Sequence, residues 1–108
     1  MSEAVYAVVL VTASSEAEGL RLKKVLMDNR KAACVNMISH VESHFWWKGK
    51  IDIADEVLLI IKTKVSAVND IIKLVKEAHS YLIPEIIALP VIAGNEDYLK
   101  WVDEEVKD

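Results

Sequence analysis

The 108-residue sequence predicts a single α+β domain in which helices pack on one face of an antiparallel sheet. Three observations support this prediction. Apolar, β-branched segments typical of strands recur along the chain, two helical patterns interrupt them, and no linker or repeat divides the sequence. Hydrophobic residues make up 53% of the chain, which argues against disorder. We therefore expect one domain, residues 1–108, with one core.

The first half of the chain predicts a strand, a helix and a long hairpin. Ser15 and Glu18 have the spacing of a capping box, so a helix is expected to begin there. Lys48-Gly49-Lys50 supplies the turn chemistry that joins two strands in a hairpin. The expected elements are a strand over 4–13, a helix ending near Arg30, and strands over 33–47 and 51–63.

The second half predicts a helix, a strand and a short final helix. Ser66 is the expected cap of the helix, whose apolar stripe repeats at i, i+3, i+4 and i+7. Pro90 in the following strand, 85–93, indicates an edge position or a bulge. Asn95 is expected to cap the final helix. Together the elements follow the ferredoxin-like βαββαβ order with an extra C-terminal helix.

Two adjacent tryptophans, Trp46 and Trp47, predict self-association. Neighbouring side chains on a strand point to opposite faces, so one indole is expected to enter the core of the subunit. The other indole needs cover, because a large exposed aromatic surface is a liability on a monomer. The second face of the sheet is also too apolar to remain in water. Another copy of the chain is the simplest cover for both.

Charge and composition exclude several classes of partner. The formal net charge is −4, and the basic residues are scattered among acidic ones, so a nucleic-acid interface is not expected. No apolar run approaches the roughly 20 residues that span a membrane. The acidic N-terminal stretch does not resemble a signal peptide, and the single cysteine forbids an internal disulfide. We therefore predict a soluble, cytoplasmic protein.

Cys34 and His79 are the residues best suited to carry chemistry. As a pair they would form a thiolate–imidazole nucleophile, but a cysteine in an apolar strand is usually inert. His79 lies at i+4 from Val75 on the apolar stripe, so it is expected to face inward at the end of the helix. Two interpretations of His79 stay open: a hydrogen-bonded core histidine, or a ligand or proton donor at the floor of a cleft.

Four other polar residues are expected to lie on strands. His40 and His44 would be about 13 Å apart on one strand, too far to share a metal ion, and we interpret them as solvated. Glu56 and Lys62 flank a buried run and face the same side, so each needs a partner if another subunit covers it.

Six segments, in order, resemble the CutA family, the divalent-cation tolerance proteins. They are Ala32–Asn36, Trp47–Lys50, Glu56, Lys62-Thr63, His79–Pro90 and Tyr98–Trp101. The resemblance implies a ferredoxin-like subunit in a homotrimer similar in architecture to the PII proteins, in which strands of one subunit extend the sheet of the next. It also implies a link to tolerance of copper and other divalent metals, and no enzymatic reaction.

The resemblance further implies a functional cleft between subunits. Its residues would be Cys34, Trp47, Glu56, Lys62, His79, Tyr81, Tyr98 and Trp101, with His79 and Cys34 as candidate ligands of copper. Four positions depart from relatives: Val11 stands where some relatives have a cysteine, Ala78 replaces a second histidine, Ser80 replaces the usual proline, and Lys31 replaces the usual leucine. These departures argue against high-affinity copper binding.

Two functions therefore compete, with a third behind them. The first is a non-enzymatic, trimeric metal-tolerance protein. The second is a PII-like effector module that binds a small anion or metabolite in the inter-subunit cleft, with Lys62 and His79 as cationic contacts and Trp47 or Trp101 as the apolar wall. The third, an enzyme using Cys34 and His79, needs an exposed thiol of low pKa.

Overall fold

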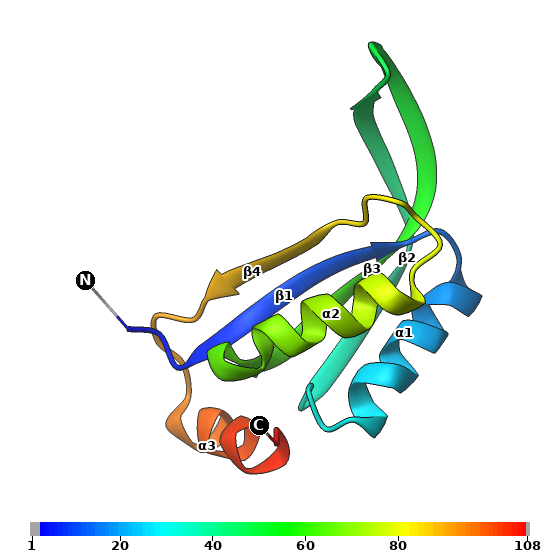
Figure 1. Ribbon diagram of the computed structural model, residues 1–108. Coiled ribbons are helices and arrows are strands. Elements are labelled where there is room, and N and C mark those ends of the chain that lie inside the picture. Colours follow the sequence, from blue (N-terminus) through cyan, green and yellow to red (C-terminus); the bar gives the residue numbers. More distant parts are fainter. Residues whose placement is uncertain (1–2, 108) are drawn as a thin grey trace.

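The computed structural model describes residues 3–107, so residues 1–2 and 108 of the predicted domain lie outside the described residues (Figure 1). The elements are β1 (Tyr6–Ala13), α1 (Glu16–Asp28), β2 (Cys34–Trp47), β3 (Lys50–Lys64), a 3₁₀ turn (Val65–Ala67), α2 (Val68–Ala78), β4 (Ile86–Pro90) and α3 (Glu96–Glu105). The strand order β2-β3-β1-β4, antiparallel throughout, confirms the predicted ferredoxin-like fold. Pro90 lies on the edge strand β4, as expected.

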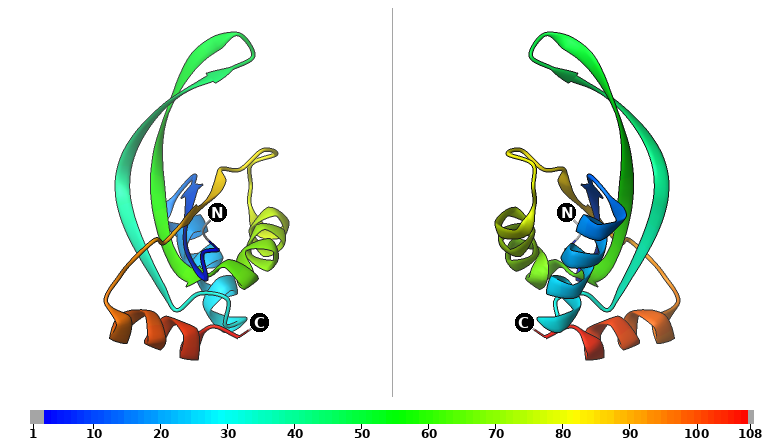
Figure 2. Two further views of the ribbon diagram at one scale, coloured as in Figure 1. Left: turned by 90° about the vertical axis from the view of Figure 1, so that its left-hand side faces the viewer. Right: turned by 90° about the vertical axis from the view of Figure 1, so that its right-hand side faces the viewer.

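The core lies between the sheet and its helices. Helices α1 and α2 cover one face of the sheet, and α3 closes the end near the C-terminus (Figures 1 and 2). Alternate residues of the two central strands point at the helices and are fully buried, as are the apolar residues that meet them. This core comprises Val9, Val11, Leu59 and Ile61 of the sheet, with Leu22, Leu26, Ile71, Val75, Val102 and Val106. Burial of these side chains supplies the main stabilising free energy of the subunit.

The two helix caps that the sequence predicts for α1 and α2 have different outcomes. Ser15 caps α1 as expected, since its hydroxyl accepts the backbone N–H of Glu18 at 3.1 Å. The prediction that Ser66 caps the second helix is wrong. The chain first makes the 3₁₀ turn, and Ala67, which has no capping side chain, stands before α2. Ala67 is fully buried, so core packing determines where this helix begins.

The β2–β3 hairpin extends beyond the sheet as a two-stranded arm. Strand β1 pairs with β3 only over Val57–Lys64, so residues 50–56 pair with β2 alone. Figure 2 shows the arm projecting from the rest of the subunit. The prediction that one indole enters the core is wrong: Trp46 is 72% and Trp47 44% exposed, because no core lies beneath the arm.

The face of the sheet opposite the helices is apolar and uncovered. Because side chains alternate along a strand, the residues between the core positions point to this face. They are Val8, Leu10, Leu58 and Ile60, which are half-buried, with Ile38, Ile87 and Leu89, which are exposed. A single subunit therefore leaves a continuous apolar surface in water, as the sequence predicted.

The turn at the tip of the arm requires a left-handed backbone at two successive residues. Lys48 has φ 50° and Gly49 has φ 81°. Gly49→Ala should therefore destabilise the arm by about 1 kcal/mol, because a Cβ disfavours this conformation. Lys48→Asn should not weaken the arm, since asparagine tolerates the left-handed region. Hydrogen exchange of the arm amides measures both, and an exchange rate unchanged in Gly49→Ala would contradict the expectation.

Candidate functional site

The eight residues implied for the cleft form two groups within one subunit. Cys34, Lys62, Tyr98 and Trp101 lie near one end of β3. Glu56, His79 and Tyr81 lie near the middle of β3, at the base of the arm, and Trp47 of the arm lines a pocket with Tyr81. Cys34 is paired with Lys62, whereas His79 contacts Thr12, which is paired with Leu58. Four residues of strand, about 13 Å, separate these positions, so the structure does not bring Cys34 and His79 together.

The Cys34 end combines a thiol, an ammonium group and two aromatic rings. The Lys62 ammonium donates to Asn36 Oδ1, and the Cys34 Sγ lies 3.8 Å from the same oxygen. The rings of Tyr98 and Trp101 pack with centroids 5.5 Å apart. Burial raises the pKa of the Tyr98 hydroxyl, and so does the neighbouring Cys34.

A small pocket opens between this end of the sheet and α3. Its volume is about 270 Å³ and its lining is mostly apolar, with Lys62 among the polar residues, which also include Tyr6, Thr63, Asn95 and Tyr98. An ammonium group at an apolar pocket suits a ligand with one anionic group and an apolar body.

His79 is a buried, fully hydrogen-bonded residue at the end of α2. Its side chain is 0% exposed. The Nε2 atom lies 2.7 Å from the Thr12 carbonyl oxygen, which can only accept, so Nε2 carries the proton. The Nδ1 atom accepts the backbone N–H of Tyr81 at 3.0 Å. Of the two interpretations of His79, the structure agrees with the hydrogen-bonded core histidine. His79 could coordinate a metal only by giving up one of these hydrogen bonds.

Tyr81 and Glu56 form a hydrogen-bonded pair beside His79. The Tyr81 hydroxyl donates to Glu56 Oε2 at 2.8 Å, and Glu56 is only 6% exposed. Burial, then this carboxylate, and last the charge of Glu18 raise the pKa of Tyr81 to about 12. Burial also raises the pKa of the nearby Glu85, and the charge of Glu56 adds to the effect. The pair lines an open pocket of about 480 Å³, which residues of the arm, including His44 and Phe45, complete.

Glu18 is the buried charged residue whose role the sequence did not reveal. Its side chain is 3% exposed and ionised. Burial alone would raise the pKa of Glu18, but hydrogen bonds from Ser14 and Ser80 outweigh it and hold the pKa at about 2. The capping-box spacing was the only sequence signal, and it predicted a purely local partner.

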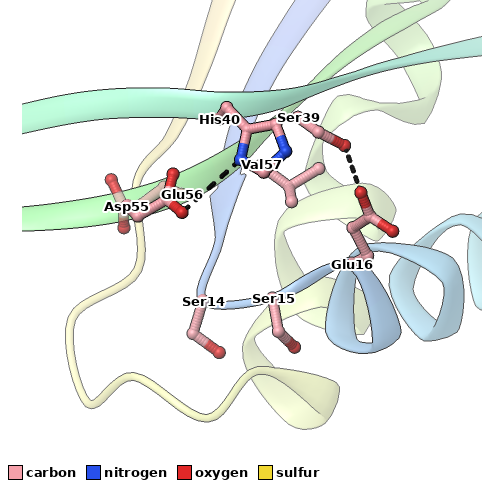
Figure 3. Close-up of a pocket in the computed structure, with 8 residues that line it drawn as sticks. All are labelled: Ser14, Ser15, Glu16, Ser39, His40, Asp55, Glu56 and Val57. Atoms are coloured by element: carbon pink, nitrogen blue, oxygen red, sulfur yellow. Dashed lines mark hydrogen bonds and ion pairs between the residues drawn. The ribbon is translucent and has the colours of Figure 1, made fainter.

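Another hollow, of about 250 Å³, lies where α1 begins (Figure 3). The Ser39 hydroxyl donates to Glu16 Oε1 at 2.7 Å. His40 stands at an irregularity in the β2–β3 register with φ 62°, and its Nδ1 lies 3.6 Å from Asp55. The His40 side chain is largely exposed, which agrees with its interpretation as a solvated residue. The pocket is therefore open and polar.

The described residues contain no preformed metal centre. Across residues 3–107, no three His, Cys, Asp or Glu side chains converge closely enough to hold one ion.

No helix within residues 3–107 combines the length and the apolar character needed to cross a membrane.

Comparison with known proteins identifies the family. The family model for the CutA1 divalent ion tolerance protein matches residues 7–105. The "Divalent-cation tolerance protein CutA" of Thermus thermophilus is 40% identical over 97 residues, covering 90% of this chain and 94% of the relative. The chain belongs to the CutA family. The "Protein CutA 1, chloroplastic" of rice is 41% identical over 94% of this chain, which spans only 57% of the length of that protein.

Solved CutA structures share the fold over nearly the whole chain. The Cut A1 structure from Thermus thermophilus superimposes with a TM-score of 0.92 at 38% identity, covering 94% of this chain and 99% of the other. The CutA1 structure from a psychrotrophic Shewanella gives 0.95 at 29% identity, covering 99% and 100%. The resemblance inferred from the ordered segments is thereby confirmed.

The low pKa of Glu18 predicts a pH dependence of stability. Because the folded pKa is lowered from 4.5 to about 2, ionised Glu18 stabilises the fold above pH 4.5. This contribution, about 3 kcal/mol, should be lost as the pH falls from 4.5 toward 2. Glu18→Gln should lack this part of the dependence, and Glu16→Gln should retain it. Urea unfolding at a series of pH values measures the difference; equal slopes for wild type and Glu18→Gln would refute the assignment.

Proposed function

We propose that this CutA protein acts in tolerance of divalent cations as a cytoplasmic, non-enzymatic homotrimer. The observation that carries the proposal is the division of the cleft residues. One subunit holds them in two groups at different positions along β3, and only association with other copies would complete a single cleft. The exposed arm and the uncovered apolar face offer the surface for that association. A thiol and an imidazole that do not meet in the subunit also provide no nucleophile–base pair for catalysis.

We propose further that Cys34 makes the principal contact with the metal and that His79 of a neighbouring copy in the trimer is the second ligand. A thiolate and an imidazole are donors that favour copper. Cys34 is a free thiol and partly exposed, so it is available without rearrangement. His79 would join only by exchanging its bond to Tyr81 or to Thr12 for the metal. A site that depends on this exchange should bind more weakly than a preorganised one.

Calorimetric titration of the metal-free protein with Cu²⁺ tests the assignment. We expect saturable binding that Cys34→Ser weakens at least about tenfold, since the thiolate is the principal ligand. His79→Gln should weaken it less. The matched control is His44→Gln, because His44 is exposed and bonded to Glu42 on the arm. Binding that is indifferent to both Cys34 and His79 would contradict a direct metal site at these residues.

A second candidate function is the recognition of a small anionic metabolite, as in a PII-like effector module. The pocket of about 270 Å³ beside α3 favours it, because Lys62 places a positive charge against an apolar lining. A ligand there should change tryptophan fluorescence through Trp101, and Lys62→Gln should abolish the change. A panel of anionic metabolites that leaves both fluorescence and melting temperature unaltered would count against this function.

A further inference from the structure

Glu18 joins two segments that are distant in the sequence. Its Oε1 accepts the backbone N–H of Ser14 at 2.8 Å and the Ser14 hydroxyl at 3.0 Å. Its Oε2 accepts the backbone N–H of Ser80 at 2.8 Å. One oxygen thus binds the turn that precedes α1, and the other binds the loop that follows α2. In an ordinary capping box the carboxylate would bind only the start of its own helix.

Arg21 strengthens the same connection from the next turn of α1. Its Nη2 donates to Glu18 Oε2 at 3.2 Å and to the Ala78 carbonyl at 3.1 Å. Ala78 is the last residue of α2, so Arg21 also binds the end of that helix. The carboxylate and the guanidinium therefore hold the chain on both sides of His79.

The segment that these bonds hold determines where Tyr81 lies. Ser80 and Tyr81 are adjacent, and the backbone N–H of Tyr81 is fixed on His79 Nδ1. The Tyr81 hydroxyl then reaches Glu56 on β3. Beyond Tyr81 the loop exposes Leu82 and Ile83, which do not anchor it. The loop therefore has few tethers, and Glu18 is the charged residue that binds its backbone at Ser80.

We propose that Glu18 and Arg21 form a latch that acts from helix α1 and holds the loop after α2 in the conformation that places the Tyr81 hydroxyl on Glu56. Glu18 is thus a positioning residue for the Tyr81–Glu56 pair, which it does not contact through a hydrogen bond. This inference requires neither metal binding nor the trimer, so it stands or falls separately from the proposed function.

Glu18→Gln separates the latch from the cap. The glutamine oxygen can still accept from Ser14, but its NH₂ group then faces the N–H of Ser80, so two donors oppose each other. The start of α1 keeps its bonds, and the loop and Arg21, which both donate to Oε2, lose their partner. Glu16→Gln is the matched control, because it removes the same charge from the same turn of α1 and its carboxylate binds Ser39.

Two measurements follow the loop in these variants. Hydrogen exchange of the Ser80 and Tyr81 amides should be at least about tenfold faster in Glu18→Gln and unchanged in Glu16→Gln. Carbon-13 NMR of labelled tyrosines, with Tyr81 assigned through Tyr81→Phe, should show the ring signals of Tyr81 shifting in Glu18→Gln and unchanged in Glu16→Gln, because the ring leaves its place beside Glu56 only when the latch is lost.

A double-variant comparison makes the test specific to positioning. Glu56→Gln should shift the Tyr81 ring signals in the wild-type background and in Glu16→Gln, but should have little further effect in Glu18→Gln, where the hydroxyl no longer lies on residue 56. An equal effect in all three backgrounds would overturn the proposal, as would wild-type exchange of the loop amides in Glu18→Gln.

Arg21→Gln keeps the test decisive if Glu18→Gln does not fold. The Arg21 side chain is 52% exposed, so this variant should fold. It should show smaller changes in the same direction in both measurements. Wild-type values in Arg21→Gln would then overturn the latch.

Discussion

The pairing of strand β3 is the constraint on which the rest of the subunit depends. Strand β3 has 15 residues, nearly twice the 8 of β1, and β2 matches it along almost its whole length. In its second half, alternate residues such as Leu59 face the helices while Leu58 faces the uncovered side. Its first half pairs with β2 alone and forms the arm. One strand thus sets the core, the open apolar face and the exposed aromatic residues.

The same strand also spaces the chemical groups. Lys62, near the end of β3, faces Cys34 across the ladder, and Glu56, near the base of the arm, receives the hydroxyl of Tyr81. A rigid strand keeps these two positions apart, so one subunit cannot gather the family's cleft residues by a local movement. We therefore propose that association with other copies of the chain covers the open face and the arm and completes the cleft.

Local and periodic features of the fold were predictable from the sequence. The Ser15 cap, the Lys48-Gly49 turn and the inward direction of His79 depend on residues within one or two turns, and the structure agrees with each. The indoles of Trp46 and Trp47 were not predictable, because alternation gives the side of a strand but not whether a core lies beneath it. The start of α2 was likewise set by packing of Ala67, which a capping pattern cannot show.

The geometry of the candidate site was only partly predictable from the sequence. The ordered segments identified the family, and the eight cleft residues that the resemblance implies stay a prediction. They did not reveal that His79 has both ring nitrogens bonded, nor that Glu18 reaches Ser80, 62 residues away. Such partners depend on tertiary contacts between α1 and the loop after α2. At Ser80, where the resemblance expects a proline, this chain supplies a backbone N–H, and the structure uses it.

The proposed cleft requires that other copies of the chain cover the open sheet face and the arm. Sedimentation equilibrium of the purified protein at micromolar concentration tests it most directly. We expect a mass of about 36 kDa, three times the 12.1 kDa of one chain. A mass of 12.1 kDa at these concentrations would show that the subunit tolerates its exposed apolar face alone, and would contradict the assembly proposed for this protein.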